Sequence, residues 1–225
     1  MAKLVLFDID GTLLRGHGVG ARAMRRAAEI VLGERCRDAQ LEFGGALDPL
    51  LFRELARHGG YSVDDAIHAT YRKLYAELLV QEMATAERPC QALPGVHDLL
   101  ARMRAERPAI LGLLTGNYAE TGSHKLRSAG IDPDWFEVAA WGDMAEQRPG
   151  LVQVALAQLA ARPVAQDVIV VGDTVRDVQC AHANGGVCVA VATGHTSAAE
   201  LAEAGADVVL DDLRDPMPLL RMLAG

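Results

Sequence analysis

The chain opens with a short apolar stretch that ends abruptly in two carboxylates and a glycine. Residues 4–7 read Leu-Val-Leu-Phe, and Asp8, Asp10 and Gly11 follow within four positions. An apolar run of this length, stopped by glycine, is typical of a central parallel strand that is covered on both faces. Ligands of open parallel sheets lie beyond the carboxyl ends of the strands. The stretch therefore predicts an α/β fold with Asp8 and Asp10 at its ligand-binding edge.

Strand-like and helical segments alternate in the C-terminal part of the chain. Residues 167–171 are the clearest further strand, and residues 109–114 are also strand-like. Weaker strands are expected over 136–141, within 186–194 and over 206–210, and helices over 96–107, 119–129, 150–161 and 216–223. Strands that alternate with helices predict a doubly wound parallel sheet, that is, a Rossmann-like core.

Residues 16–88 form a nearly all-helical block. Helices are expected over about 21–32, 48–60 and 62–86. Asp48 and Ser62 are the expected N-terminal caps of the second and third of these helices. Three glycines between residues 16 and 20 indicate a hinge, because their spacing matches neither common phosphate-binding fingerprint. We therefore expect an α/β core of residues 1–15 and 89–225 with an inserted α-helical subdomain of residues 16–88.

The charge balance and the cysteines narrow the class of protein. The 225 residues include 22 Lys and Arg against 30 Asp and Glu, a net charge of −8, and contain no basic run. Nucleic acid and anionic membranes are therefore not expected partners, and no stretch reaches the ~18 apolar residues of a membrane span. The four cysteines lack a metal-binding spacing. We expect a cytoplasmic protein that is a monomer or a homodimer.

Polar side chains follow three of the expected strands, where parallel strands bring their ends together. The three pairs are Asp8 and Asp10, Thr115 and Asn117, and Asp173 and Asp177. Two carboxylates about 5 Å apart repel by about 3 kcal/mol at an effective dielectric constant near 20, so the site needs positive charge. Hard oxygen ligands without Cys or His indicate Mg²⁺, which also binds phosphate oxygens.

These side chains suit phosphoryl transfer. Asp8 could attack phosphorus and form an aspartyl-phosphate. Asp10 could protonate the leaving oxygen and then deprotonate the water that hydrolyses the intermediate. The Thr115 hydroxyl and the amides of Gly116 and Asn117 could hold the phosphoryl oxygens. The expected activity is a Mg²⁺-dependent phosphomonoester hydrolase that acts on a small phosphorylated metabolite.

The same segments resemble a known family. Residues 8–13, Asp-Ile-Asp-Gly-Thr-Leu, resemble the DxDGT signature of the haloacid dehalogenase-like hydrolase superfamily, in particular its phosphoglycolate phosphatase-like members. Residues 114–117 resemble the second motif of that family, residues 171–174 with Asp177 the fourth, and residues 190–194 the segment after the next strand. The resemblance covers essentially the whole chain, including the helical insertion.

The resemblance implies roles for the acidic residues. Asp8 would be the nucleophile and Asp10 the acid and base. Mg²⁺ would be held by the Asp8 side chain, the Asp10 backbone carbonyl and Asp173, with Asp177 close by or acting through water. The insertion would be a mobile cap that closes over the site and selects the substrate.

The chain departs from the family pattern at the third motif, which is commonly a Lys-Pro pair. The corresponding segment here is Gln147-Arg148-Pro149. Arg148 could supply the positive charge, although its planar fork does not replace an ammonium group directly. Lys125, on the helix after Asn117, is the other candidate and the one we favour.

Two other functions remain open at this point. A phosphosugar mutase of the same superfamily would keep Asp10 but would need a cap that shelters the phosphorylated enzyme from water. A non-enzymatic phospho-accepting signalling domain also uses an acidic cluster with Mg²⁺, but the insertion and Asp10 argue against it. We expect residues 43–48 to face the site, and Arg22 and Arg53 are candidates for binding a second anionic group of the substrate.

Overall fold

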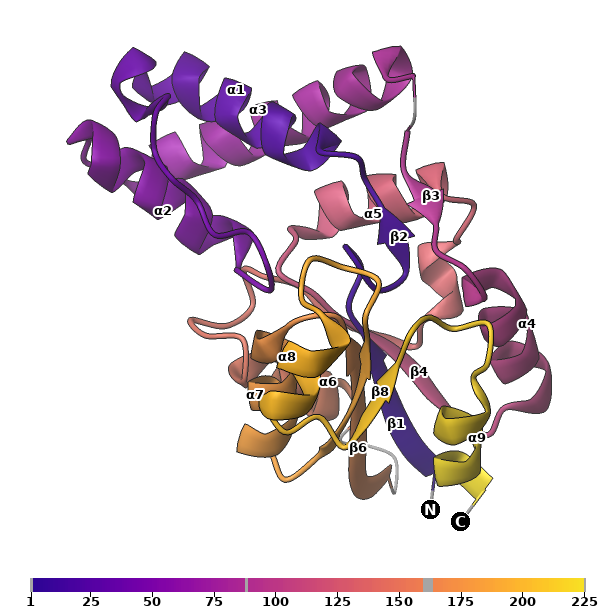
Figure 1. Ribbon diagram of the computed structural model, residues 1–225. Helices are drawn as coiled ribbons and strands as arrows, with labels where there is room; N and C mark the ends of the chain where they lie inside the picture. Colours follow the sequence, from indigo (N-terminus) through magenta and orange to yellow (C-terminus); the bar gives the residue numbers. More distant parts are fainter. Residues whose placement is uncertain (1, 88, 160–163, 225) are drawn as a thin grey trace.

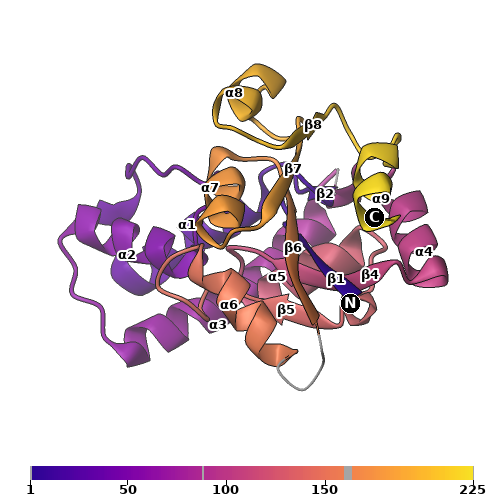
Figure 2. The ribbon, with the colours of Figure 1, turned by 90° about the horizontal axis from the view of Figure 1, so that it is seen from below.

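A parallel sheet forms the centre of the molecule. The computed structural model describes residues 2–87, 89–159 and 164–224. In this part of the chain six parallel strands lie in the order β5-β4-β1-β6-β7-β8 (Figures 1 and 2). The strands are β1 (Ala2–Phe7), β4 (Ala109–Leu114), β5 (Val138–Ala140), β6 (Val164–Gly172), β7 (Val187–Val191) and β8 (Val208–Leu210). This arrangement confirms the doubly wound α/β fold expected from the sequence.

Helices cover both faces of the sheet, as the alternation of side chains along β1 requires. Val5 and Phe7 belong to one buried cluster and Leu4 and Leu6 to the other. The first cluster includes α4 (Val96–Glu106), α5 (Ala119–Ser128) and α9 (Met217–Ala224), and the second α6 (Gly150–Gln158), α7 (Val175–Ala183) and α8 (Ala198–Glu203). Figure 2 shows these helices around the strands.

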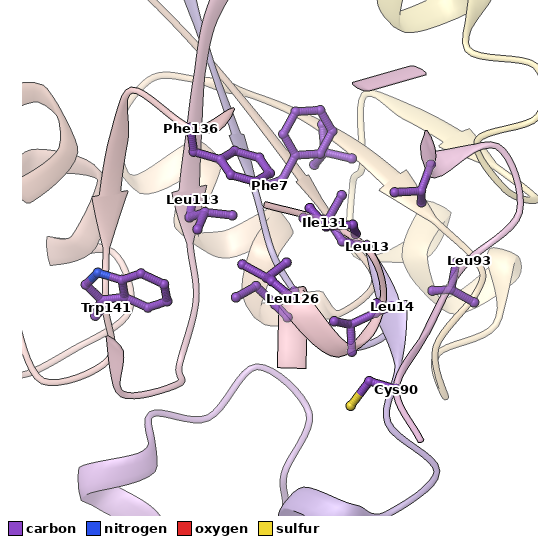
Figure 3. Packing of buried hydrophobic residues seen from close by; sticks show 14 of the residues in the cluster. Phe7, Leu13, Leu14, Cys90, Leu93, Leu113, Leu126, Ile131, Phe136 and Trp141 are labelled. Atoms are coloured by element: carbon purple, nitrogen blue, oxygen red, sulfur yellow. The ribbon is translucent and has the colours of Figure 1, made fainter. Parts of the chain in front are cut away.

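Large apolar side chains anchor the strand that carries the acids. Phe7, the residue before Asp8, is fully buried, as are Leu113 of β4 and Leu126 of α5 (Figure 3). Burial of one such side chain stabilises the fold by about 1.5–3 kcal/mol. The position of Asp8 is therefore set by a well-packed strand rather than by a loop.

Three helices occupy the insertion: α1 (Val19–Leu32), α2 (Asp48–Gly59) and α3 (Asp65–Thr85). They lie beyond the carboxyl edge of the sheet (Figure 1). The chain leaves and re-enters the core through two short antiparallel strands, β2 (Leu14–Arg15) and β3 (Gln91–Ala92), which pair with each other. Two short 3₁₀ helices, η1 (Glu34–Cys36) and η2 (Pro133–Trp135), complete the described elements.

Most expected element boundaries agree with the structure to within a few residues, but both expected helix caps are wrong. Asp64, and not Ser62, caps α3, and its side chain accepts from the Ile67 N–H at 2.8 Å. Asp48 lies inside the first turn of α2, and its carboxylate instead accepts from the backbone N–H of Tyr118 in the core. A tertiary contact thus replaces the local cap.

A few differences in length have local causes. The helix α1 begins at Val19 because Gly18, with φ of 79°, is its N-cap. The end of the helix expected over 150–161 lies outside the described residues, as does residue 88 at the expected core boundary. Within the described part of the chain, every helix is too short or too polar to cross a bilayer.

Candidate active site

The register of the sheet brings the strand ends together. Phe7 of β1 lies opposite Leu113 of β4 and Val171 of β6. The N–H of Asp8 donates to the carbonyl of Val171 at 2.9 Å, which extends the pairing to the first acid. The chain passes from β1 to β4 on one side and reaches β6 on the other, so this edge is the topological switch point at which such sheets bind ligands.

Three buried carboxylates form a compact group at this edge. Asp8, Asp173 and Asp177 each place one oxygen within 4.8 Å of the others. Burial is the main reason that the pKa of Asp8 rises to about 6. Burial, followed by repulsion from Asp8 and Asp177, raises the pKa of Asp173 to about 8. Such a group is stable in its charged form only beside cations or hydrogen-bond donors.

Glycines allow the Asp173 carboxylate to fit. A Cβ atom at Gly11 would lie 2.3 Å from Asp173 Oδ2, and one at Gly194 only 1.7 Å from the same atom. Gly11 also has a φ of +84°, which side chains other than glycine rarely adopt. Thr12 donates its hydroxyl to the other Asp173 oxygen at 3.2 Å. The glycine of the DxDGT motif is therefore needed both for its backbone angle and for the space that it leaves.

Arg148 supplies positive charge to the acidic group. Its Nη2 lies 3.2 Å from Asp8 Oδ1 and 2.5 Å from Asp177 Oδ1, and its Nε donates to the same Asp177 oxygen at 3.1 Å. The side chain is only 5% exposed. Its Nη1 donates to the carbonyl of Gly45 in the insertion at 3.2 Å. Arg148 therefore joins two carboxylates of the core to the insertion.

Both oxygens of the Asp177 carboxylate are engaged by neighbouring donors. Oδ1 accepts from Arg148, and Oδ2 accepts from the Thr174 hydroxyl at 2.6 Å and the Thr174 N–H at 3.1 Å. Asp177 is fully buried. It therefore orients the guanidinium of Arg148.

Lys125 lies at the other acid. Its Nζ is 2.7 Å from Asp10 Oδ2 and donates to Asn117 Oδ1 at 2.7 Å. Asn117 Nδ2 in turn donates to Asp10 Oδ2 and to the Thr115 hydroxyl oxygen, both at 2.8 Å. Thr115 and Asn117, which both lie in the turn after β4, are thus linked to Asp10 through amide and ammonium groups.

The two candidate cations occupy different places in one site. The sequence left Arg148 and Lys125 as alternatives for a single position, whereas the structure places Arg148 on Asp8 and Lys125 on Asp10. Both basic side chains are buried. Each acid of the first motif therefore has its own cation.

The insertion packs directly on this edge, with residues 43–48 against the core. The N–H of Asp48 donates to the carbonyl of Gly116 at 2.7 Å. A Cβ atom at Gly116 would lie 1.8 Å from the carbonyl oxygen of Ala46, so glycine is required for this approach. The segment that we expected to face the site does border it.

A cavity of about 730 Å³ lies between the insertion and the core. Asp8, Asp10, Thr115 and Asp173 line it from the core, and Met24, Phe43, Leu51 and Tyr75 line it from the insertion. Arg22 and Arg53 do not line it; Arg22 pairs with Glu82 instead. Three basic residues that the sequence did not single out, Arg15, His17 and His195, also line the cavity. Their only signal in the sequence is position, since Arg15 and His17 follow the first motif and His195 follows residues 190–194.

A model of the haloacid dehalogenase-like hydrolase family matches residues 2–185, which include all the site residues predicted from the sequence. The chain belongs to this family. This hydrolase is 27% identical over 227 residues to phosphoglycolate phosphatase of Yersinia pestis, with 96% of this chain and 92% of the relative covered. The expected family is thereby confirmed.

Solved structures of related proteins share the fold of this hydrolase. A hydrolase from Pseudomonas syringae superposes with a TM-score of 0.72 at 21% identity and full coverage of both chains. CbbY from Rhodobacter sphaeroides, solved in complex with phosphate, has a TM-score of 0.67 at 24% identity, with 96% of this chain and 97% of CbbY covered. Both agree with the topology described above.

Proposed function

We propose that this hydrolase is a Mg²⁺-dependent phosphatase that cleaves a small phosphorylated metabolite through a phosphorylated Asp8. The family and the phosphatase relatives support the reaction class. The observation that carries the proposal is the pairing of the two acids of the first motif with separate cations, Asp8 with Arg148 and Asp10 with Lys125. One carboxylate is thereby kept ready to attack and the other to exchange a proton.

Asp8 and Asp10 divide the two steps between them. In the first, an Asp8 oxygen bonds to phosphorus, the bond from phosphorus to the leaving oxygen breaks, and Asp10 gives that oxygen a proton. In the second, Asp10 takes a proton from a water molecule, the water oxygen attacks phosphorus, and the bond to Asp8 breaks. Inorganic phosphate and the alcohol are the products, and both carboxyl groups return to their starting state.

Thr115 is oriented to bind the transferring group. Its buried hydroxyl oxygen accepts from the Asn117 side chain at 2.8 Å and from the Asn117 N–H at 3.3 Å. An oxygen that accepts two hydrogen bonds keeps its own proton for donation. We infer that this proton, together with the amides of Gly116 and Asn117, holds the phosphoryl oxygens.

The donor set fits Mg²⁺. The acidic group offers only carboxylate oxygens, and Asp8 and Asp173 lie close enough to share one ion. We propose that their side chains hold it with the Asp10 backbone carbonyl, and that Asp177 contributes mainly by orienting Arg148. The ion, when bound, would offset the carboxylate charge and polarise the phosphoryl oxygens.

We propose that residues 16–88 are a cap that selects the substrate, and that residues 1–15 and 89–225 are the catalytic core. The paired strands β2 and β3 are the two crossings between these parts. The cap contributes the apolar side of the cavity and contacts the core through residues 43–48. A closed cap would exclude bulk water during phosphoryl transfer.

A phosphatase screen over a panel of phosphorylated metabolites, with Mg²⁺ or with EDTA, tests the proposal. Wild-type protein should release phosphate from at least one of them only with Mg²⁺, and Asp8→Asn should abolish release while the urea unfolding midpoint stays close to that of wild type. Full Mg²⁺-dependent activity in Asp8→Asn would contradict the proposed role of Asp8 as the nucleophile. A long-lived phosphorylated Asp8 would instead support a signalling domain, and phosphate transfer within the substrate a mutase.

A further inference from the structure

Lys125 gives the site a buried cation in addition to the one that contacts Asp8. Among the described residues, the ion pairs of Arg148 are with Asp8 and Asp177, and that of Lys125 is with Asp10. A cation that served the transferring phosphoryl group would be expected beside Asp8, where Arg148 already lies. The position of Lys125 therefore calls for a different explanation.

Lys125 and Asn117 act on the same atom of Asp10. Lys125 Nζ and Asn117 Nδ2 both donate to Asp10 Oδ2, at 2.7 and 2.8 Å. Lys125 also donates to Asn117 Oδ1, so the three side chains form a closed ring of hydrogen bonds. This ring holds Oδ2 and fixes the plane of the carboxyl group, which leaves Oδ1 for proton exchange.

Helix α1 of the insertion packs against the Lys125 ammonium group. A Cβ atom at Gly20 of α1 would lie 3.1 Å from Lys125 Nζ and 3.6 Å from the Tyr75 hydroxyl. The Lys125 side chain is only 7% exposed, whereas the Asp10 side chain is 42% exposed. Hydrogen bonds from a buried ammonium are stronger than in water, because the local dielectric constant is low. The ring thus has a rigid, covered side at Lys125 and an open side at Asp10.

We propose that Lys125 is a positioning residue for Asp10: with Asn117 it aims Oδ1 at the oxygen of the leaving group and does not bind the transferring phosphoryl group. This inference rests on the proposed phosphatase activity. It follows that Lys125 increases kcat/KM most for esters whose leaving group must be protonated in order to depart. Arg148, beside Asp8, matters for every phosphate ester alike.

The leaving-group dependence of Lys125→Met tests this assignment. The two substrates are p-nitrophenyl phosphate, whose phenolate leaves without a proton, and glycerol 1-phosphate or the fastest alkyl phosphate of the screen. The measured quantity is kcat/KM, which reports the steps up to departure of the leaving group. General acid catalysis contributes about 10²- to 10⁴-fold, so we expect a loss of that order on the alkyl ester and less than about tenfold on the aryl ester.

Matched variants make the result decisive. Asp10→Asn should show the same contrast, Asn117→Ala a smaller one, and Lys125→Arg should recover part of the alkyl activity. Arg148→Lys should affect both esters equally. Misfolded protein lowers both rates by one factor, so the ratio between esters is independent of it.

Equal losses on the two esters in Lys125→Met, or no loss on the alkyl ester, would overturn the assignment while leaving the phosphatase proposal standing. Wild-type protein that hydrolyses no phosphate ester would instead reject the proposed function itself.

Discussion

Asp48 belongs to the insertion, and its carboxyl group is buried against the core. Burial is the main reason that its pKa rises from 3.8 to about 7, although Lys125 and the Tyr118 N–H lower it. Asp10 faces it from the core and opposes its ionisation. The phenols of Tyr71, Tyr75 and Tyr118 also interact electrostatically with Asp48. Asp48 therefore holds a proton in the folded protein at pH values at which the unfolded chain has lost it.

The sign of the effect follows from this difference in pKa. Between pH 3.8 and about 7 the folded state binds the extra proton at Asp48, so the free energy of unfolding falls as the pH rises. One pH unit corresponds to about 1.4 kcal/mol, and the window spans about three units. Ionisation of Asp48 should therefore cost the native state on the order of 4 kcal/mol at pH 8 relative to pH 4.

Asp48→Asn removes this titration but keeps an oxygen that can accept from the Tyr118 N–H, now at 3.2 Å. Urea unfolding in metal-free buffer, measured from pH 4 to pH 8, compares the variant with wild type. The variant should gain stability over wild type progressively up to about pH 7 and keep that gain above it. The matched control is Asp64→Asn, an exposed helix cap at which asparagine also caps well.

The control should show no comparable gain between pH 4 and pH 7. A stability difference between Asp48→Asn and wild type that does not change with pH would refute the reasoning, because the carboxyl group would then titrate normally in the folded state.

Two further predictions concern the contacts between the site and its surroundings. Arg148→Met leaves the fully buried Asp177 without its cation and should lower the free energy of unfolding by about 3–5 kcal/mol in urea titrations; a loss below about 1 kcal/mol would contradict the importance of this pair. Gly116→Ala places a Cβ atom 1.8 Å from the Ala46 carbonyl oxygen. It should lower kcat/KM several-fold and speed proteolysis of the insertion, and wild-type values in both assays would show that this close packing is not needed.

Features that depend on neighbouring residues could be predicted from the sequence. The apolar run before Asp8 indicated a buried strand, and the alternation of strands and helices indicated the parallel sheet, because both patterns reflect periodic burial along a short segment. The expected strand over 109–114 coincides with β4. Parallel strands end at the same edge of a sheet, so the convergence of Asp8, Thr115 and Asp173 could be predicted from the sequence.

Pairings between distant residues could not be predicted in this way. Lys125 lies 115 residues from Asp10 in the chain, and Arg148 lies 140 residues from Asp8, so no local pattern records which acid each cation meets. Asp48 has the sequence context of a helix cap, yet a backbone N–H of the core competes successfully for its carboxylate. Periodicity sets where a side chain faces on its own element, but the packing of elements sets which charges meet, and in this hydrolase that packing assigns a separate cation to each acid of the first motif.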